Sequence, residues 1–512
     1  MWLRSPTIHQ KIASSNEDKP IVVSVYRQRL LMLLCLLVVL FCYSFGTNTV
    51  GAALQDLPNL GDSSSGVISP DQEYIAGRAW LRVLRGQAPI ISDPLLNDYV
   101  THLTYHLASF SELNQRKLEV VIINDSSINA FAVPGGVMGI NAGLLLNAES
   151  EDEMAAVIAH EIAHLSQRHF ARNLERSRRD KWKTVAALIA SVALIASSSN
   201  SDTGLAALLT TQAASLQSQL SYSRQFEREA DRFGMTTLAK AGKDPSAMPR
   251  FFERMHKATE NYSKAPPEFL LTHPVTESRI SDSYNRIIQL PLTTPEASLD
   301  FSLMKARVEA SYSPDKLKNI KTFRLQAKNA STPIERAAAQ YGLVRSLLKS
   351  NHYKAALKAL EPLRKNDPNR IAYIVAEAEI YMAQSRYEKA RDVLEAELTV
   401  IPESYALGIY YAQTLLRTQS PDKAAPRLRT LLRDHPNDPQ LWRLLSEAYG
   451  ATGNIVGVHE ARAEVFFLYN RNEQALQQLR YALDLTKENF PRSAKIKQRM
   501  QEIQAHSLDL RG

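Results

Sequence analysis

The organisation of this 512-residue chain can be worked out from one stretch, Ala159-His160-Glu161-Ile162-Ala163-His164. The stretch lies inside a helical pattern from about Glu151 to Glu175, in which apolar residues recur every three to four positions. Ser150 stands before this pattern with Glu153 three residues later, and the spacing predicts a capping box at the start of the helix. We therefore expect one long helix with a buried apolar face.

Two histidines of this stretch are four residues apart, so His160 and His164 leave the same face of the helix one turn apart. Two ligands of one tetrahedral zinc ion need this arrangement. Glu161 follows the first histidine and could accept a proton from the attacking water. The alternative is a helix that happens to carry two surface histidines. Against this alternative, placing a Glu and two His on a mostly apolar helix costs free energy, and surface histidines without a function would not explain that cost.

A zinc site of this kind needs a third protein ligand. A histidine six residues beyond His164 would be one solution, but Phe170 stands there. In a later helical segment, Glu227 and Asp231 are four apart and share one face, while Glu229 points elsewhere. We expect Glu227 to be a ligand and Asp231 to hydrogen-bond a ligand or the reacting group. The alternative is a solvated charged face.

Residues 129–141 read Asn-Ala-Phe-Ala-Val-Pro-Gly-Gly-Val-Met-Gly-Ile-Asn, two short extended runs around a Pro-Gly-Gly turn. A strand with few bulky side chains beside a zinc helix could pair with an extended peptide. The candidates for this role are Asn129, Phe131, Gly135 and Gly136. An ordinary hairpin fits the pattern equally well, so both interpretations stay open.

The chain resembles the zinc peptidase family of the CAAX prenyl protease and the heat-shock protease HtpX over about residues 71–290. The resemblance rests on three motifs in the same order, Asn-Ala-Phe-Ala-x-Pro-Gly-Gly, His-Glu-x-x-His and Glu-x-x-Ala-Asp. It implies a zincin-type α+β metalloprotease domain with one zinc ion per chain. The residues that it assigns are the zinc ligands His160, His164 and Glu227, the general base Glu161 and, as a second catalytic acidic residue, Asp231.

Integral-membrane members of this family have spanning helices, whereas here only residues 184–196 form a comparable apolar run. Thirteen residues are too few to cross a bilayer as a helix. The run could be buried, cover the active site or make a peripheral contact with a membrane, and we favour burial.

His273 is followed by Pro274, which favours an extended conformation on a predicted loop, in a segment that also matches the family, Thr272–Ile280. His256, the other histidine of this region, belongs to a charged helical stretch. We expect His273 to gate the site by taking the fourth zinc position in a resting form. A rival hypothesis makes it a donor to the oxyanion of the intermediate, and a third leaves it without a role.

A 34-residue period begins at about Thr332. It is carried by prolines, tyrosines and alanines at the same spacing, namely Pro368, Pro402, Pro436, Tyr353, Tyr387, Ala356, Ala390 and Ala424. This period is the signature of tetratricopeptide repeats, which stack into an α-solenoid with a concave surface for another protein. Three repeats are clear, and residues 437–469 and 471–487 look like a degenerate repeat and a cap. The alternative is a stack that only supports the protease part.

The first 53 residues are predicted to be a secretory signal peptide. Arg27 and Arg29 precede an apolar run at residues 30–45, and small residues follow at Gly51 and Ala53. Sixteen apolar residues are few for a membrane span, so an uncleaved anchor is the less favoured alternative. Both cysteines of the chain lie in this segment, so we expect a mature chain without disulfides. A bacterial periplasm fits this expectation.

The composition argues for a folded protein that does not bind nucleic acid. Residues of the apolar types make up 45% of the chain, which is enough for sizeable cores. The net charge of +8 is modest for this length and is spread out. The chain has no lysine-rich tract or interleaving of aromatic and basic residues of the kind that favours nucleic acid.

We predict a mainly α protein with a signal peptide (1–53), a zinc metalloprotease domain (54–300), a linker (301–331) and a tetratricopeptide repeat domain (332–512). The resemblance, taken with secretion and repeats, implies a periplasmic endopeptidase. Its repeats would dock unfolded or misassembled outer-membrane proteins or their assembly machinery. The alternative is a repeat scaffold or chaperone for outer-membrane assembly proteins, with little proteolysis at rest.

Overall fold

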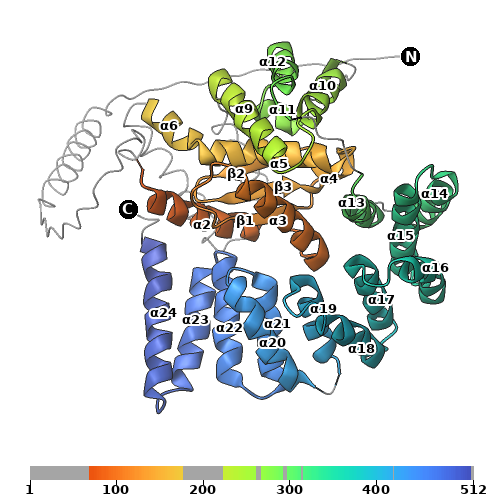
Figure 1. Cartoon of the computed structure of the whole chain (residues 1–512). Helices are drawn as coiled ribbons and strands as arrows, with labels where there is room; N and C mark the ends of the chain where they lie inside the picture. Colours follow the sequence, from red (N-terminus) through yellow and green to blue (C-terminus); the bar gives the residue numbers. More distant parts are fainter. Residues whose placement is uncertain are drawn as a thin grey trace, which may run out of the picture. The chain divides into compact units, whose positions relative to one another are not determined.

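The computed structural model describes residues 68–176, 223–260, 267–291, 297–312, 315–418 and 420–508 (Figure 1). All of these residues belong to one unit of the chain, Asp62–Gly512. The predicted signal peptide and the apolar run at 184–196 lie outside the described residues, so both stay predictions.

Two helices and a small sheet form the first part of the described chain. Helices α2 (Pro70–Gln87) and α3 (Pro94–Ser109) each follow a residue whose side chain accepts a backbone N–H, and each has proline in its first turn. The strands are β1 (Glu119–Ile123), β2 (Ala130–Val133) and β3 (Val137–Asn141). Strand β3 pairs parallel with β1 and antiparallel with β2, so β2 is an edge strand.

The turn between β2 and β3 depends on its two glycines. Gly135 and Gly136 have φ angles of +82° and +77°, which residues with a side chain rarely adopt. Helix α2 lies directly against this turn: Arg78 donates a hydrogen bond to the Gly135 carbonyl at 2.6 Å. A Cβ on Gly135 would overlap the carbonyl oxygen of Glu73. The two glycines therefore serve the packing of the hairpin on α2.

The helix predicted around the zinc motif is α5 (Glu151–Ser166), which follows the short helix α4 (Ala142–Asn147). Ser150 caps α5 by accepting the Glu153 N–H, as predicted, but the Glu153 carboxylate accepts the N–H of Glu149 instead of that of Ser150. Helix α5 contacts α3, β2, α9 and α10. A helix enclosed in this way can hold His and Glu side chains away from water.

The expectation of one helix as far as Glu175 is wrong. Helix α5 ends at Ser166, and α6 (His169–Arg176) begins after a break at Arg168, which has a φ of +48°. That conformation cannot continue a right-handed helix. Apolar residues continue across the break at Phe170, which is why the sequence pattern predicted a single helix.

Helices α9 (Arg224–Lys240) and α10 (Ala247–Glu260) pack on α5, and α12 (Glu277–Ile287) packs on both of them. The short helix α11 (Glu268–Thr272) precedes α12 in the chain. Gly234 allows α9 to approach closely, because a Cβ at this position would lie only 3.2 Å from the backbone nitrogen of His160. The close approach brings the acidic residues of α9 to the histidines of α5.

The remaining helices are α13 and α14, in the region of the predicted linker, and the predicted solenoid from α15 onward (Figure 1). Their bounds are α13 (Leu299–Tyr312), α14 (Lys316–Asn329), α15 (Pro333–Lys349), α16 (Tyr353–Asn366), α17 (Ile371–Ala383), α18 (Tyr387–Leu398), α19 (Tyr405–Leu415), α20 (Pro421–Asp434), α21 (Pro439–Ala451), α22 (Ile455–Leu468), α23 (Asn472–Asp484) and α24 (Phe490–Leu508). The second helices of four successive pairs begin at residues 353, 387, 421 and 455, which preserves the 34-residue period. The predicted fold class, a small-sheet protease part followed by an α-solenoid, is confirmed.

The paired helices continue beyond the three repeats that are clear in the sequence. Ala356, Ala390 and Ala424 are fully buried in the second helices of three pairs. The equivalent position in α22 is Val458, and Asn470 stands where the earlier repeats have proline. These two replacements explain why residues 437–469 look like a degenerate repeat in the sequence.

The predicted linker contains α13 and α14, which pack on α15. Arg307 on α13 is 1% exposed, and its guanidinium contacts Asp93 at 2.7 Å and Glu379 of α17 at 3.0 Å. A continuous hydrophobic core extends from Leu95 of α3 to Tyr410 of α19. The packing therefore crosses the predicted boundary between the protease part and the repeats.

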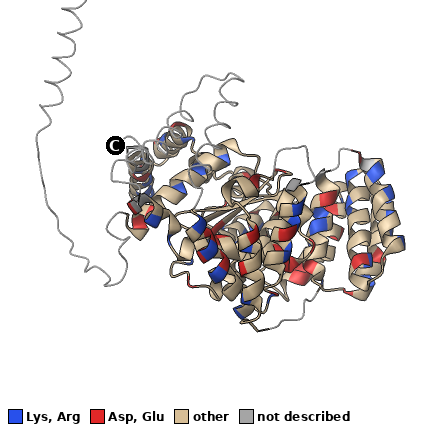
Figure 2. Ribbon diagram, turned by 90° about the horizontal axis from the view of Figure 1, so that it is seen from above, with Lys and Arg blue, Asp and Glu red and all other residues tan. Residues whose placement is uncertain are grey.

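Basic and acidic residues are interspersed along the described helices (Figure 2). Several of them form ion pairs between helices, such as Arg492 with Glu460 and Arg499 with Glu464, which connect α24 with α22 at 2.7 Å. The net charge of +8 is thus distributed over the chain.

Candidate metal centre

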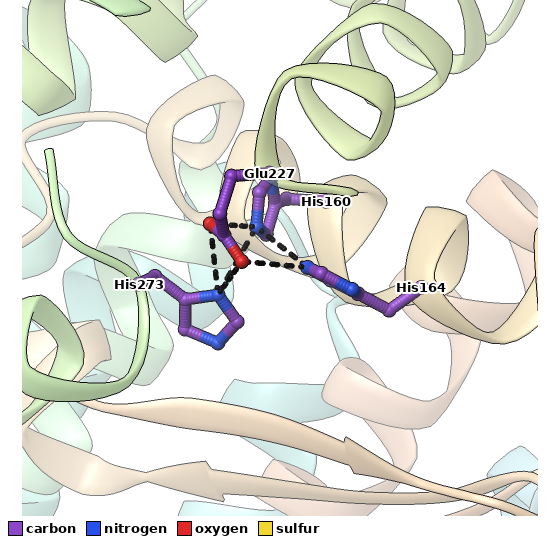
Figure 3. A group of neighbouring side chains, drawn as sticks. All are labelled: His160, His164, Glu227 and His273. Atoms are coloured by element: carbon purple, nitrogen blue, oxygen red, sulfur yellow. Dashed lines mark hydrogen bonds and ion pairs between the residues drawn. The ribbon is translucent and has the colours of Figure 1, made fainter. Parts of the chain in front are cut away.

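Four buried side chains from three parts of the chain point toward one another (Figure 3). His160 and His164 come from α5, Glu227 comes from the first turn of α9, and His273 follows the last residue of α11. One donor atom from each of the four lies within 4.8 Å of the others. The structure therefore brings together the predicted ligands and the predicted gating histidine.

Five of the six distances between these donor groups fit a tetrahedral ion. The Nε2 atoms of His160 and His164 are 3.0 Å apart, and His160 Nε2 is 3.3 Å from His273 Nδ1. The carboxylate of Glu227 is 3.1 Å from His273 Nδ1 and 3.5 Å from each of the other two imidazoles. Ligands at zinc bond lengths of about 2.0–2.1 Å and tetrahedral angles lie about 3.3–3.4 Å apart. Imidazole and carboxylate donors in this number suit zinc.

The charge of the site also fits a divalent cation. Three buried carboxylates and one guanidinium occupy it: Glu161, Glu227, Asp231 and Arg279. With ionised acids and the neutral histidines that metal ligation requires, three negative charges and one positive charge leave a sum of −2. Because uncompensated charge inside a protein is costly, a bound dication would stabilise this arrangement.

Asp231 contacts the nitrogen of His160 that faces away from the other donors. Its Oδ1 lies 3.0 Å from His160 Nδ1, and Arg279 of α12 donates two hydrogen bonds to its carboxylate at 2.7 and 2.8 Å. Although burial works against ionisation, the Arg279 charge keeps the pKa of Asp231 below its usual value. This geometry matches the expectation that Asp231 hydrogen-bonds a ligand.

His164 has a partner that the sequence did not predict. Its Nδ1 lies 2.9 Å from Nδ1 of His169, the first residue of α6, and His169 Nε2 lies 3.5 Å from Glu229. Arg172 donates to Glu229 at 3.1 Å. Burial lowers the pKa of His169 to about 4, which leaves the imidazole neutral at pH 7. Glu229 does not join the four donors, as expected, but it contacts them through His169.

Glu161 lies at the edge of the donor set. Its carboxylate is 3.3 Å from Nε2 of His273 and accepts a hydrogen bond from the backbone of Ala132 on β2. Burial raises the pKa of Glu161 above its usual value, which makes the carboxylate a better proton acceptor. The role of Glu161 as a general base stays a prediction.

The environment separates the pKa values of the ligands. Burial lowers the pKa of His160, but its hydrogen bonds with Asp231 and Glu227 raise it overall, to about 9. Burial would raise the pKa of Glu227, but His273, His160 and Arg279 keep it well below the usual range. Glu227 is therefore ionised at neutral pH, as a carboxylate ligand must be.

Two functional contacts escaped the sequence analysis. Arg279 belongs to the segment singled out for His273, but its partner Asp231 is 48 residues away in the chain. His169 lies only five residues after His164, yet its direction depends on the break at Arg168. For the Arg279–Asp231 contact, the only local indication in the sequence is the capped, amphipathic start of α12. No local sequence pattern indicates the contact of His169 with His164.

The predicted substrate-strand residues all belong to the hairpin. Asn129 is buried just before β2, and its carbonyl accepts the N–H of Asn141. Phe131 of β2 packs edge-on against Trp80 of α2, with ring centroids 5.5 Å apart. The glycines form the turn described above. Strand β2 is an edge strand in contact with α5, and its pairing with a peptide stays a prediction.

Comparison with known proteins identifies the family. The model of peptidase family M48 matches residues 94–286, which contain all four donors. A "Beta-barrel assembly-enhancing protease" of Escherichia coli strain K12 is 34% identical over 450 residues, 87% of this chain and 91% of that protein. The chain belongs to peptidase family M48. Models of tetratricopeptide repeats match residues 341–405 and 381–448 of this M48 chain.

Other relatives agree with the M48 assignment. A Vibrio cholerae protein, which is also named as a beta-barrel assembly-enhancing protease, is 36% identical over 82% of this chain and 87% of its own length. The "Mitochondrial metalloendopeptidase OMA1" of Schizosaccharomyces pombe is 31% identical over 36% of this chain and 50% of its own. The chain is therefore a metalloendopeptidase, as predicted, and the four donors are its candidate metal site.

As noted above, integral-membrane members of the family have helices that span a bilayer. Within the residues that the structure describes, each helix is too short or too polar to pass through a bilayer.

Proposed function

We propose that this M48 chain is a zinc endopeptidase in which His160, His164 and Glu227 hold the ion. The observation that carries the proposal is the buried set of four donors within 4.8 Å of one another, with five of the six pairs at 3.0–3.5 Å, in a site of negative charge. Zinc bound there would supply Lewis acidity toward the peptide carbonyl and toward water.

The residues around the donor set have separate tasks. Glu161, buried and with a raised pKa, accepts a proton from the attacking water and returns it to the leaving amine. Asp231 acts on the ring of His160, because Arg279 and the imidazole occupy its oxygens. This favours a positioning role for Asp231 over direct contact with the substrate. We keep Glu161 as the catalytic residue.

His273 supports a resting state in which the site is closed. Its Nδ1 belongs to the donor set, and its Nε2 faces Glu161 at 3.3 Å. In this position the His273 imidazole occupies the fourth donor place and contacts the proposed general base. Proteolysis requires the fourth place to be open for water and the general base to be free. The backbone N–H of His273 bonds to the Phe269 carbonyl, and its ring stacks on Phe269. We therefore propose that His273 is a gate, in preference to an oxyanion donor.

The proposed compartment is the periplasm, and the proposed clients are outer-membrane proteins or their assembly machinery. The names of the relatives refer to β-barrel assembly, and the sequence predicts a signal peptide of 53 residues. The helical repeats would provide the docking surface, since such solenoids bind other proteins on their concave side. The position of His273 favours a second candidate as well, a repeat chaperone that seldom cleaves its clients at rest.

Replacing the general base tests the proposed chemistry. Glu161→Gln should keep the metal, because Glu161 is not one of the four donors, but should cleave an unfolded β-barrel substrate about 10²–10⁴-fold more slowly. Glu149→Gln, at an exposed position before α5, is a control that should cleave at the parent rate. Cleavage by Glu161→Gln at the parent rate would reject the mechanism.

A further inference from the structure

The break between α5 and α6 gives His169 a direction that a continuous helix would not. At 100° per residue, five residues span 500°, so His169 would lie 140° around the axis from His164. The left-handed backbone of Arg168 removes this offset. The Arg168 side chain is anchored to the Ile68 carbonyl at 2.8 Å and to Glu73 at 3.3 Å. The first turn of α6 is thereby directed back to the metal centre.

His169 is held in place on each side of its ring. It is fully buried, and it stacks on Phe226 with ring centroids 4.5 Å apart and an angle of 18°. Phe226 is the residue before the proposed ligand Glu227, so one turn of α9 supports both the ligand and the ring of His169. On the far side, Glu229 lies 3.5 Å from Nε2 of His169.

The protons of these two imidazoles can be assigned from their neighbours. His164 presents Nε2 to the donor set, so as a metal ligand its proton must sit on Nδ1. That N–H faces Nδ1 of His169, 2.9 Å away. Nδ1 of His169 must then carry no proton, and its own proton sits on Nε2, toward Glu229. In this arrangement the Nε2–H of His169 faces the Glu229 carboxylate at an ion-pair distance of 3.5 Å.

We propose that His169, oriented by Glu229, is a positioning residue that fixes the ring and tautomer of His164 for metal binding. This inference rests on the proposed metal function. The two helical ligands then have equivalent supports from different residue types. Asp231 with Arg279 holds His160, and His169 with Glu229 holds His164. Partners of metal-bound histidines typically contribute 10–100-fold to metal affinity.

Two substitutions of His169 separate hydrogen bonding from packing. His169→Phe keeps a flat ring against Phe226 but removes the acceptor for the Nδ1–H of His164. His169→Asn places an amide oxygen near the former Nδ1 position and so can keep that acceptor. His459→Phe in the repeats is the matched control, because it also removes one imidazole hydrogen bond, here to Gln478 at 2.8 Å.

The test is zinc affinity of the full chain, measured by competition with a chelating dye. We expect His169→Phe to weaken zinc binding about 10–100-fold, His169→Asn to weaken it less, and His459→Phe to leave it unchanged. Thermal unfolding of the metal-free proteins, measured alongside, shows whether the variants fold. In the zinc-bound parent, the Nδ1–H proton of His164 should give a low-field NMR signal that His169→Phe loses and His459→Phe keeps.

Other outcomes would overturn the inference. Unchanged affinity in His169→Phe would do so, as would equal weakening in the Phe and Asn variants, because the effect would then come from packing. If His169→Phe does not fold, Glu229→Gln is the deciding variant. It should weaken zinc binding several-fold, and an unchanged zinc affinity would reject the proposed positioning of His164 by His169 and Glu229. A parent chain that binds no zinc would reject the proposed function itself, which is a separate result.

Discussion

At the scale of single residues, each imidazole of the candidate metal centre has a defined neighbour at both nitrogens. His160 is placed between the donor set and Asp231, His164 between the donor set and His169, and His273 between Glu227 and Glu161. Rings with both nitrogens engaged cannot turn freely, so their donor atoms are directed before any ion arrives. Pre-directed ligands of this kind reduce the ordering cost of binding.

His273→Ala gives the sharpest prediction at this scale. If the open form of a gated site is populated at about 10% or less, removing the gate should raise cleavage of an unfolded substrate by about tenfold or more. Self-cleavage should rise too. The measurement is a steady-state cleavage rate at saturating zinc, with His102→Ala on α3, an exposed histidine, as the control. A fall in rate would favour the oxyanion role, and no change would leave His273 without either role.

The residues of the site differ in how readily the sequence predicts them. His160 and His164 are four apart on a helix with a strong apolar pattern, so their common direction follows from helical geometry alone. His169 depends on the backbone break at Arg168, and Arg279 depends on the packing of α12 on α9. Contacts of this second kind are set by tertiary structure, which a single sequence does not encode in any local pattern.

At the scale of elements, the hairpin β2–β3 and helix α2 form one packed unit beside α5. The turn is closed by the φ angles of Gly135 and Gly136, and α2 covers it. The sequence predicted the two extended runs and their turn, but it could not place α2 over them. The same limit applies to α5, whose apolar pattern runs on past the break that separates it from α6.

Gly135→Ala tests the packing role of this turn. The substitution adds left-handed strain of about 1–2 kcal/mol and an overlap with α2 that costs about 1–3 kcal/mol more. Gly453→Ala is the matched control: its φ is +73°, but a Cβ there meets no atom within 4 Å, so only the strain should remain. Urea unfolding of both variants gives the comparison. If Gly135→Ala were no less stable than Gly453→Ala but had a higher KM, the substrate-strand interpretation would be favoured.

At the scale of the whole described chain, Arg307 connects the protease part with the repeats. Its guanidinium binds Asp93, Glu379 and the hydroxyls of Tyr341 and Tyr410. Asp93 and Glu379 are 214 and 72 residues from Arg307 in sequence. The 34-residue period predicted the stacked repeats because it is local and recurrent. It could not predict this junction, whose partners are far apart and belong to different elements.

Arg307→Met should destabilise the chain by about 3 kcal/mol at pH 7, because it removes the cation between two half-buried carboxylates, Asp93 and Glu379, and only Glu379 keeps another ion pair, with Arg345. Burial raises the pKa of Asp93 and Glu379, but Arg307 lowers both overall, below 3.8 and 4.5. The pairing therefore stabilises the parent above those values and is lost as the pH falls through the lowered pKa values. In the variant, protonation relieves the penalty at low pH. The difference in unfolding free energy should shrink from pH 7 to pH 3.

Urea unfolding at several pH values measures this difference. Arg324→Met on α14 is the control, since Arg324 is exposed and its replacement should change stability by about 0.5 kcal/mol or less. Equal stability of the parent and Arg307→Met at pH 7 would mean that the junction does not depend on this ion pair.

The zinc content of the purified protein tests the assignment of the donor set most directly. Metal analysis against protein concentration should give about one zinc per chain for the parent and for Glu161→Gln, because three protein ligands remain in both. His164→Ala should lose most of the metal, since it removes one of the three proposed ligands. A parent chain that binds no zinc, or His164→Ala protein that keeps one zinc per chain, would contradict the assignment.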